Sequence, residues 1–224
     1  MNNRFFTYND EKLEKLIFDL TKDPVLWWSR IYEYYWALNI ISSDIREKNV
    51  YDSCCGTFHS FKFALAEFNN NKVFASDLAS LDKMNILSEI SNYFPTEIEA
   101  KRSIIEHLED KISWRECDIA NTQYDEKMFD YITCISVFEH LDQNKQKEAL
   151  IEWFRILKDD GRVLLTCDYP WINPNDILEM AKEVGFIVDG DYNYNIPYDA
   201  INIEYCSVNT KVFNMILKKK KEVI

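Results

Sequence analysis

The sequence contains no apolar run long enough to span a bilayer, and residues 1–11 lack the hydrophobic core of a signal peptide. We therefore expect a cytoplasmic protein without a membrane partner. The six cysteines show no regular spacing. Cys54 and Cys55 are adjacent and cannot form an ordinary zinc pair, and no cluster of His, Cys, Asp or Glu has metal-ligand spacing. We expect reduced cysteines and no metal site.

Positive charge is also scarce. The chain has 26 Lys and Arg against 38 Asp and Glu, which gives a net charge of −12. A protein that grips a nucleic-acid backbone needs a basic stripe, so we do not expect nucleic acid as a partner. The one concentrated basic run lies at residues 218–221. It is interpreted as a solvated tail after the last strand rather than a patch for membranes or nucleic acids.

The residues that are present can form a sizeable core. At 224 residues, with 47% hydrophobic and 15% aromatic content, the chain is expected to form one compact body. Helical spacing predicts a cap over residues 1–46, with helices at 11–20 and 27–42, in front of a core over residues 47–224. In the core, strand and helix patterns alternate. This predicts an α/β fold with a doubly wound, mostly parallel, Rossmann-like sheet and an antiparallel last strand. Strands are expected at residues 50–53, 73–76, 113–117, 131–136 and 162–167, helices at 59–69, 80–93, 97–109, 144–157 and 175–184, and an antiparallel pair at 201–207 and 212–218 around Asn209 and Thr210.

Residues 50–58 are the most informative stretch, because an apolar strand runs through an acid into a turn around Gly56 and a helical pattern follows. Free N–H groups at a helix start, beside a glycine that allows close approach, can wrap a nucleotide-like ligand. Residues 72–77 indicate a second strand that ends in Asp77. That acid lies about 20 residues further on, where a ribose-binding carboxylate is expected.

Taken in order, these segments resemble the class I S-adenosylmethionine-dependent methyltransferases. VYDSCCGTF at residues 50–58 is similar to their first motif, FDYITCISVFEHL at 129–141 to their fourth-strand motif, and ILKDDGRVLL at 156–165 to the turn into their fifth strand. The resemblance implies S-adenosyl-L-methionine as cofactor, S-adenosyl-L-homocysteine as product, and Asp77 as the ligand of the ribose hydroxyls. The implied cofactor-binding residues of the core are Asp52, Cys54, Gly56, Asp77, Leu78, Asp118, Ile119 and Ser136.

Two residues depart from the first motif. Cys54 stands where the family has a glycine, and Phe58 replaces its last glycine. Glycine at such positions supplies a positive φ or removes a Cβ that would meet the ligand. An alternative is therefore a protein of this fold that no longer binds the cofactor, although the retained acids Asp52 and Asp77 argue against it.

The aromatic helix at residues 27–38 has two interpretations. It resembles an RxxExPWxL segment that precedes the first motif in small-molecule and sugar methyltransferases, with Tyr35 in place of the proline. That resemblance implies that Arg30 and Trp36 lie near the methionine end of the cofactor. From the residues alone, the alternative is an amphipathic helix whose aromatic side chains seal the sheet edge, with Arg30 and Glu33 at i, i+3 paired on its surface.

His140 is the candidate catalytic residue. A sulfonium is an activated methyl donor, so positioning supplies much of the rate, but a hydroxyl acceptor also needs a base. The resemblance places His140 at the end of the fourth strand, which faces the methyl group in this family. The alternative is a histidine that caps or packs at the start of the next helix.

The acceptor is expected to bind near residues 167–174 and 191–199, which are rich in Tyr, Asn and Asp. Such a set suits a polyhydroxylated ligand, and an ordinary polar loop is the alternative. We expect O-methylation of a small, carbohydrate-like acceptor, such as a sugar, a nucleotide-sugar or a surface-polysaccharide unit. N-methylation of a small amine and a non-catalytic protein are the alternatives, and a homodimer is left open. The candidate substrate residues are Asp168, Tyr169, Trp171 and Tyr194.

Overall fold

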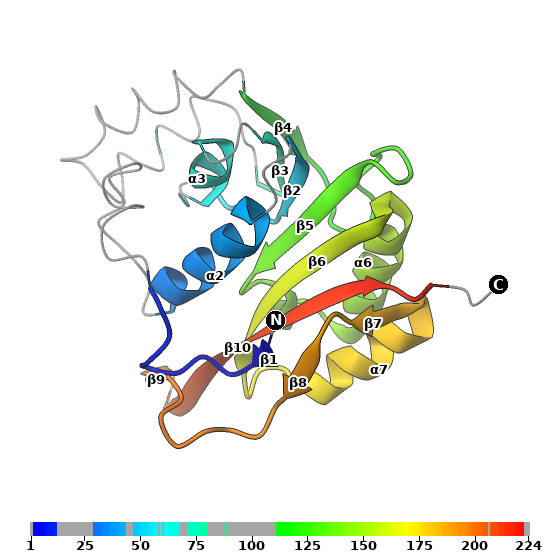
Figure 1. Ribbon diagram of the computed structural model, residues 1–224. Helices are drawn as coiled ribbons and strands as arrows, with labels where there is room; N and C mark the ends of the chain where they lie inside the picture. The colour runs from blue at the N-terminus through cyan, green and yellow to red at the C-terminus, as the bar shows by residue number, and fades with distance from the viewer. Residues whose placement is uncertain are drawn as a thin grey trace. The chain divides into compact units, whose positions relative to one another are not determined.

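The computed structural model describes residues 2–12, 29–43, 47–57, 59, 61–67, 71–79, 88, 111–205 and 207–221 (Figure 1). The predicted helices at residues 11–20, 80–93 and 97–109 lie almost entirely outside the described residues. The chain divides into two compact units. One unit is formed by residues 12–119, and the other by residues 1–11 together with residues 120–224.

The unit of residues 12–119 contains a parallel sheet. Its strands β2 (Asn49–Ser53), β3 (Lys72–Asp77) and β4 (Ile112–Glu116) follow the order β4-β3-β2, with Asp52 opposite Ala75. Val50 and Tyr51 of β2 and Val73 and Ala75 of β3 are buried, which is typical of parallel strands covered by helices. Helices α2 (Arg30–Ser42) and α3 (Phe61–Glu67) pack together through stacked rings of Tyr34 and Phe61, 4.8 Å apart.

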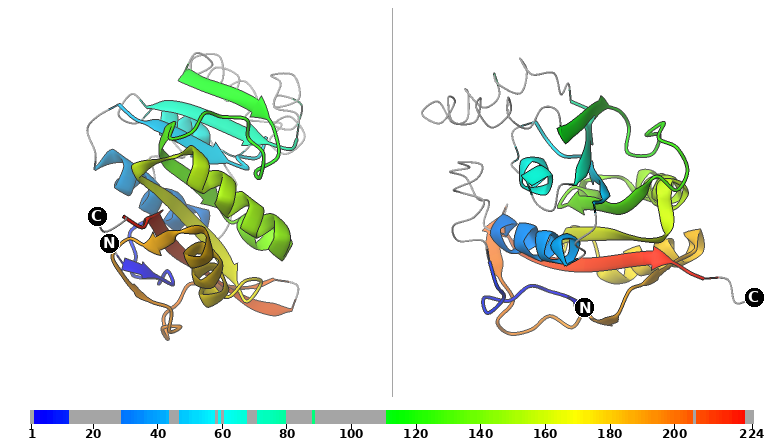
Figure 2. Two further views of the ribbon diagram at one scale, coloured as in Figure 1. Left: turned by 90° about the vertical axis from the view of Figure 1, so that its right-hand side faces the viewer. Right: turned by 45° about the horizontal axis from the view of Figure 1, so that its top comes forward.

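The other unit contains strands β5 (Phe129–Ile135), β6 (Leu157–Tyr169), β10 (Val208–Lys219) and β7 (Phe186–Val188), which lie side by side in that order (Figure 2). Strands β5 and β6 are parallel, and β10 is antiparallel to its neighbours. Strand β9 (Asn202–Tyr205) forms a hairpin with β10, and helices α6 (Gln143–Ile156) and α7 (Pro174–Val184) pack against each other. Its core is aromatic, with Phe129, Phe138, Trp153, Phe186 and Phe213 fully buried. A 3₁₀ turn (Phe138–His140) lies between β5 and α6.

These elements confirm the predicted fold class, a Rossmann-like α/β fold with mostly parallel strands and an antiparallel last strand. The predicted turn at Asn209 and Thr210 is wrong, because both residues pair within β10. The chain reverses just before β10, near Ser207, which has a φ of 61°. The basic run also differs from the predicted tail, since Lys218 and Lys219 belong to β10.

A further strand, β1 (Asn2–Arg4), was not anticipated from the sequence. It pairs in parallel with β8 (Asp191–Asn193) as a separate two-stranded sheet. Three consecutive polar residues carry no strand pattern, so only the tertiary contacts of this segment define it. The proposed boundary between a cap and a core at residue 46 stays a prediction.

Candidate functional site

The turn after β2 adopts the left-handed backbone that the sequence motif predicts. Cys54 has a φ of 56° and Gly56 a φ of 62°. At Gly56 a side chain is excluded, because a Cβ would collide with the imidazole of His59. Cys54 takes the positive φ without being glycine, at a cost of about 1–3 kcal/mol. The substitution at Cys54 therefore keeps the path of the turn.

Asp77 links the end of β3 to this turn. Its Oδ2 accepts the N–H of Gly56 at 2.9 Å, and its Oδ1 accepts the N–H of Ala79 at 3.1 Å. A carboxylate offers about four lone-pair sites, so two remain for hydroxyl donors of a ligand. The sequence places these two residues 21 positions apart, and the fold brings them into hydrogen-bond contact.

The two cysteines of the turn are neutral at physiological pH. Burial, followed by the negative charge of Asp77, raises the pKa of Cys54 to about 12. Burial raises the pKa of Cys55 further, although the charge of Lys62 opposes the shift. The turn thus places no thiolate beside Asp77, and the carboxylate is the anionic group there.

The remaining cofactor candidates of this unit lie at strand ends and in the following turns. Asp52 is buried in β2, and Leu78, directly after Asp77, is 69% exposed. The N–H of Cys117 donates to the main-chain oxygen of Asp77 at 3.0 Å, which holds the end of β4 beside the end of β3. Asp118 follows as a half-buried residue and Ile119 as a buried one. In open parallel sheets, ligands bind just outside the carboxyl ends of the strands.

In α2, Arg30 forms an ion pair with Glu33 at 2.6 Å, and Glu33 is fully buried. The ion pair expected between Arg30 and Glu33 is therefore observed, but it does not lie on the helix surface, because Glu33 is buried. Trp36 is half-buried on the same helix. Roles for Arg30 and Trp36 in holding the cofactor stay predictions.

One further residue at the turn was not predicted from the sequence. Lys62 in α3 is fully buried, and its Nζ donates to the main-chain oxygens of Cys55, Gly56 and His59 at 3.1, 2.8 and 2.6 Å. Within the run FKFALA a lysine looks like a surface residue whose stem covers the core. A lysine inside an otherwise apolar stretch directly after a glycine turn was the available signal.

The unit that contains β5 holds Ser136 and His140. Ser136 follows β5 with a φ of 46°, and its N–H donates to the main-chain oxygen of Thr166 at 3.0 Å. His140 ends the 3₁₀ turn and is exposed. Glu139 beside it is buried and accepts the N–H of Asp168 at 3.1 Å, which joins this turn to the end of β6. The histidine is therefore not a core residue.

The acceptor candidates belong to the same unit and differ in how their polar groups are engaged. The Tyr194 hydroxyl donates to the main-chain oxygen of Asn214 at 3.1 Å, and burial raises the pKa of Tyr194 well above its usual value. The hydroxyl proton of Tyr194 is thus used in a hydrogen bond within the protein. The ring of Tyr169 meets Phe5 edge to face at 5.7 Å, whereas Trp171 is 46% exposed. Asp168 is half-buried.

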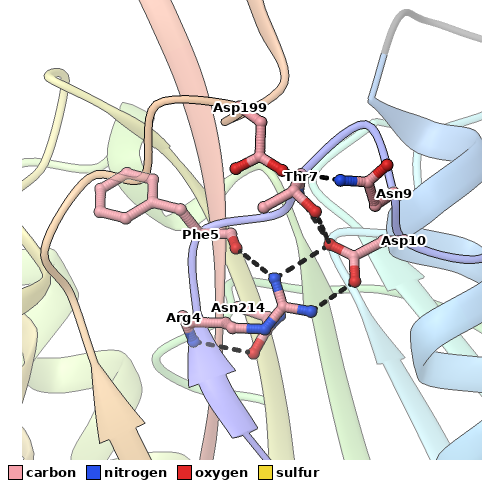
Figure 3. A network of polar contacts seen from close by, with 7 residues as sticks. All are labelled: Arg4, Phe5, Thr7, Asn9, Asp10, Asp199 and Asn214. Carbon is pink, nitrogen blue, oxygen red and sulfur yellow. Dashed lines mark hydrogen bonds and ion pairs between the residues drawn. The ribbon is translucent and has the colours of Figure 1, made fainter.

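The N-terminal segment is fixed beside these residues by a polar network (Figure 3). The guanidinium of Arg4 donates to the carboxylate of Asp10 and, at 2.8 Å, to the main-chain oxygen of Phe5. Asp10 also accepts the N–H of Thr7 at 2.7 Å. Asn9 donates to the carboxylate of Asp199 at 2.8 Å, so the network reaches the polar segment after β8.

The described part of the chain contains no candidate for two other kinds of site. No group of three His, Cys, Asp or Glu there could hold a metal ion. No helix among the described residues has both the length and the apolar character needed to cross a membrane.

The turn after β2, with Asp77 at the next strand end, defines a Rossmann-like protein with a nucleotide-type cofactor site. A family model described as a methyltransferase domain matches residues 52–165. The chain belongs to this methyltransferase family. Its cofactor is S-adenosylmethionine, and the observed turn fits it, because Asp77 retains free lone pairs and the left-handed backbone allows close approach.

Solved structures share the fold at low sequence identity. A TehB-like SAM-dependent methyltransferase from Corynebacterium glutamicum has 20% identity and a TM-score of 0.57, over 84% of this chain and 87% of the other. A 1,6-didemethyltoxoflavin-N1-methyltransferase from Burkholderia thailandensis has 14% identity and a TM-score of 0.58, over 87% and 81%. A phosphoethanolamine N-methyltransferase from Haemonchus contortus has 14% identity and a TM-score of 0.56, over 92% and 60%. No curated protein matches the sequence.

Proposed function

We propose that this methyltransferase transfers a methyl group from S-adenosylmethionine to a hydroxyl of a small, carbohydrate-like acceptor. The observation that supports cofactor use most directly is the bond between the Gly56 N–H and the Asp77 carboxylate. This bond holds the turn and the Asp77 carboxylate in a fixed relative position. The cofactor supplies an activated methyl group, so the protein needs chiefly to position donor and acceptor.

Asp77 is proposed to accept the ribose hydroxyls, with Leu78, Asp118 and Ile119 beside the adenine. His140 is proposed to take the proton from the acceptor hydroxyl. Its exposure supports this role, because a solvent-accessible imidazole can meet a substrate and exchange its proton with water. The role of His140 stays a prediction.

A carbohydrate-like acceptor is supported by exposed rings on the unit that carries His140. Trp171, Tyr192 and Tyr198 are 46%, 58% and 101% exposed. Exposed aromatic faces beside Asn and Asp side chains suit ligands that offer both an apolar ring face and hydroxyls. Sugars, nucleotide-sugars and polysaccharide units share this chemistry.

N-methylation of a small amine is the second candidate function. It is favoured by the two structural neighbours whose names state N-methyl transfer. The two reactions differ in their need for a base. An amine can react once it is unprotonated, whereas a hydroxyl depends on a base such as His140.

Calorimetric titration with S-adenosylmethionine and S-adenosylhomocysteine tests the cofactor. We expect one site per chain, and absence of binding for both would contradict the proposal. Transfer of a labelled methyl group to panels of sugars, nucleotide-sugars and amines then tests the acceptor class. Labelled product from amines alone would replace the O-methylation proposal by N-methylation.

A further inference from the structure

Lys62 is a buried cation held entirely by the cofactor turn and its surroundings. It is fully buried, and its Nζ donates to the main-chain oxygens of Cys55, Gly56 and His59. These bonds use all three donors of a lysine ammonium group. The rings of Phe63 and Trp114 lie 5.3 and 5.9 Å away, and no carboxylate among the described residues forms an ion pair with Lys62.

The three bonds fix the direction of the peptide groups in the turn. In a planar trans peptide the C=O and the following N–H point in opposite directions. The main-chain oxygen of Cys55 faces Lys62, and the N–H of Gly56 on the same peptide faces Asp77. By the same rule, the Gly56 oxygen faces Lys62 and the Thr57 N–H points away from it. That N–H has no hydrogen-bond partner among the described residues.

This arrangement also bears on the cysteine that replaces a glycine of the motif, whereas the other departure, Phe58, lies outside the described residues. Cys54 has the positive φ of a glycine, which a cysteine adopts only when its surroundings enforce it. Lys62 on one side and Asp77 on the other hold the intervening peptide, and thereby restrain the backbone that follows Cys54. Burying a cation is costly, so it is retained where its bonds organise something that apolar packing would not.

We infer that Lys62 is a positioning residue for cofactor binding: it orients the Thr57 N–H, and adds positive charge behind it, for the carboxylate of the cofactor's amino-acid portion. This inference rests on the proposed use of S-adenosylmethionine. A free N–H backed by a cation is an anion site, and the amino-acid carboxylate is the anionic group that the cofactor offers. Asp77 serves the ribose in the same site, so the two residues act on opposite ends of the ligand.

Two ligands separate these roles. S-adenosylhomocysteine has the amino-acid portion, whereas 5′-methylthioadenosine has the same nucleoside without it. In Lys62→Met, which keeps most of the unbranched side chain and removes the ammonium group, we expect S-adenosylhomocysteine to bind about 10-fold or more weakly, with methylthioadenosine affinity within about 2-fold. In Asp77→Asn both ligands should weaken, because both contain the ribose. Titration calorimetry at a temperature where each variant is folded gives these values.

A matched control is Lys219→Met in the other unit. Lys219 is also buried, with its Nζ 4.7 Å from the ring centroid of Phe154. Loss of this lysine should lower the midpoint of thermal unfolding without changing either affinity. If Lys62→Met behaves like Lys219→Met, Lys62 only supports the fold and the inference is wrong. Equal weakening of both ligands in Lys62→Met would also overturn it.

The wild-type protein provides a test that does not depend on the folding of a variant. The ¹⁵N–¹H resonance of the Thr57 amide should shift on addition of S-adenosylhomocysteine and shift far less with methylthioadenosine. Equal shifts would contradict the carboxylate assignment. If the wild type binds neither ligand, the proposed function falls together with the inference. Binding of S-adenosylhomocysteine with unchanged affinity in Lys62→Met would remove the inference alone.

Discussion

At the scale of single residues, Asp77 joins a structural role to its proposed ligand role. Its two oxygens accept the N–H groups of Gly56 and Ala79. The change Asp77→Asn replaces one of these acceptors by a donor. We expect S-adenosylhomocysteine to bind about 10-fold or more weakly, and the free energy of unfolding without ligand to fall by about 1–2 kcal/mol. Calorimetry and urea unfolding measure the two effects, with exposed Asp125→Asn as the control. Unaltered affinity in Asp77→Asn would contradict the ribose assignment.

His140 tests the proposed base chemistry. A general base contributes about 10²–10⁴-fold, so His140→Asn should lower turnover of a hydroxyl acceptor by that range. Because the side chain is exposed, stability should change by less than about 0.5 kcal/mol. Cofactor affinity should stay within a few-fold. The neighbouring exposed residue provides a control, Asn144→Ala, with unchanged turnover. Full turnover in His140→Asn would favour catalysis by positioning alone or an amine acceptor.

Cys54 provides a prediction on reactivity. Its pKa of about 12, which results from burial and then from the charge of Asp77, leaves almost no thiolate at neutral pH. Iodoacetamide at pH 7.4 should therefore alkylate Cys54 at least about 100-fold more slowly than a free thiol. The rate should rise about tenfold per pH unit, because the thiolate fraction grows until the pH reaches the pKa. Mass spectrometry of quenched peptides measures the rate, and the same peptide in urea is the control. Alkylation of the folded protein at the rate found in urea would contradict the raised pKa.

Residue patterns predicted Gly56 and Asp77 because their spacing reflects a fixed geometry of strand, turn and strand. They did not predict Lys62, whose role depends on three main-chain oxygens that come together only in the folded turn. The partner of Tyr194 was missed for the same reason. The Tyr194 hydroxyl bonds a main-chain oxygen 20 residues away, and the type of a side chain does not indicate such a contact.

At the scale of elements, an ion cluster ties β6, β7 and β10 together. Asp189, directly after β7, accepts from Arg162 at 2.5 Å and from Lys218 at 2.6 Å. Burial alone would raise the pKa of Asp189, but the hydrogen bonds from Lys218 and Arg162 outweigh it, so the pKa lies below its usual value. A carboxylate in this position stabilises the folded state only while it is ionised.

The change Asp189→Asn should lower the free energy of unfolding by about 1–3 kcal/mol at pH 7. A lowered pKa means that the folded state binds the proton less tightly than the unfolded state. The stabilisation is therefore present above the unfolded pKa and is lost as the pH falls through the lowered folded value. Urea unfolding should show the wild type and the variant converging below about pH 4. Asp160→Asn, an exposed acid, should show no gap at pH 7. A gap of constant size at every pH would exclude the ionised carboxylate as its cause.

The longer elements could be predicted because each carries a strong local signal. Strand β3 is an apolar run that ends in an acid. Helix α7 begins at Pro174 after the N-cap Asn173 and ends at Val184 before the C-cap Gly185, whose φ is 111°. Strands β1, β7 and β8 have three residues each. A strand of that length holds too few residues for a period of two, so its pairing is decided by tertiary contacts.

At the scale of the whole molecule, the N-terminal segment belongs to the same unit as residues 120–224. Asn3 is fully buried, and its side-chain nitrogen donates to the main-chain oxygens of Asp189 and Asp191 at 3.1 and 3.0 Å. Its side-chain oxygen accepts the N–H of Ile216 at 2.5 Å. A single asparagine side chain thus bonds to backbone groups more than 180 positions away in the sequence. The first strand is held by specific polar pairing with β10 and with the segment after β7.

This closure predicts a large effect from a small change. Asn3→Ala removes the amide group that donates to the main-chain oxygens of Asp189 and Asp191, and it leaves the Ile216 N–H without an acceptor. We expect the free energy of unfolding to fall by about 2–4 kcal/mol. Asn9→Ala is the matched control, because Asn9 is exposed and makes a single bond to Asp199. We expect the control to change stability by less than about 0.5 kcal/mol. Urea unfolding, followed by tryptophan fluorescence, measures both values. Equal small effects would mean that residues 2–4 are dispensable for this unit. A large effect confined to Asn3→Ala would show that the unit depends on both ends of the chain, because a buried polar group at one end then satisfies the backbone of the other.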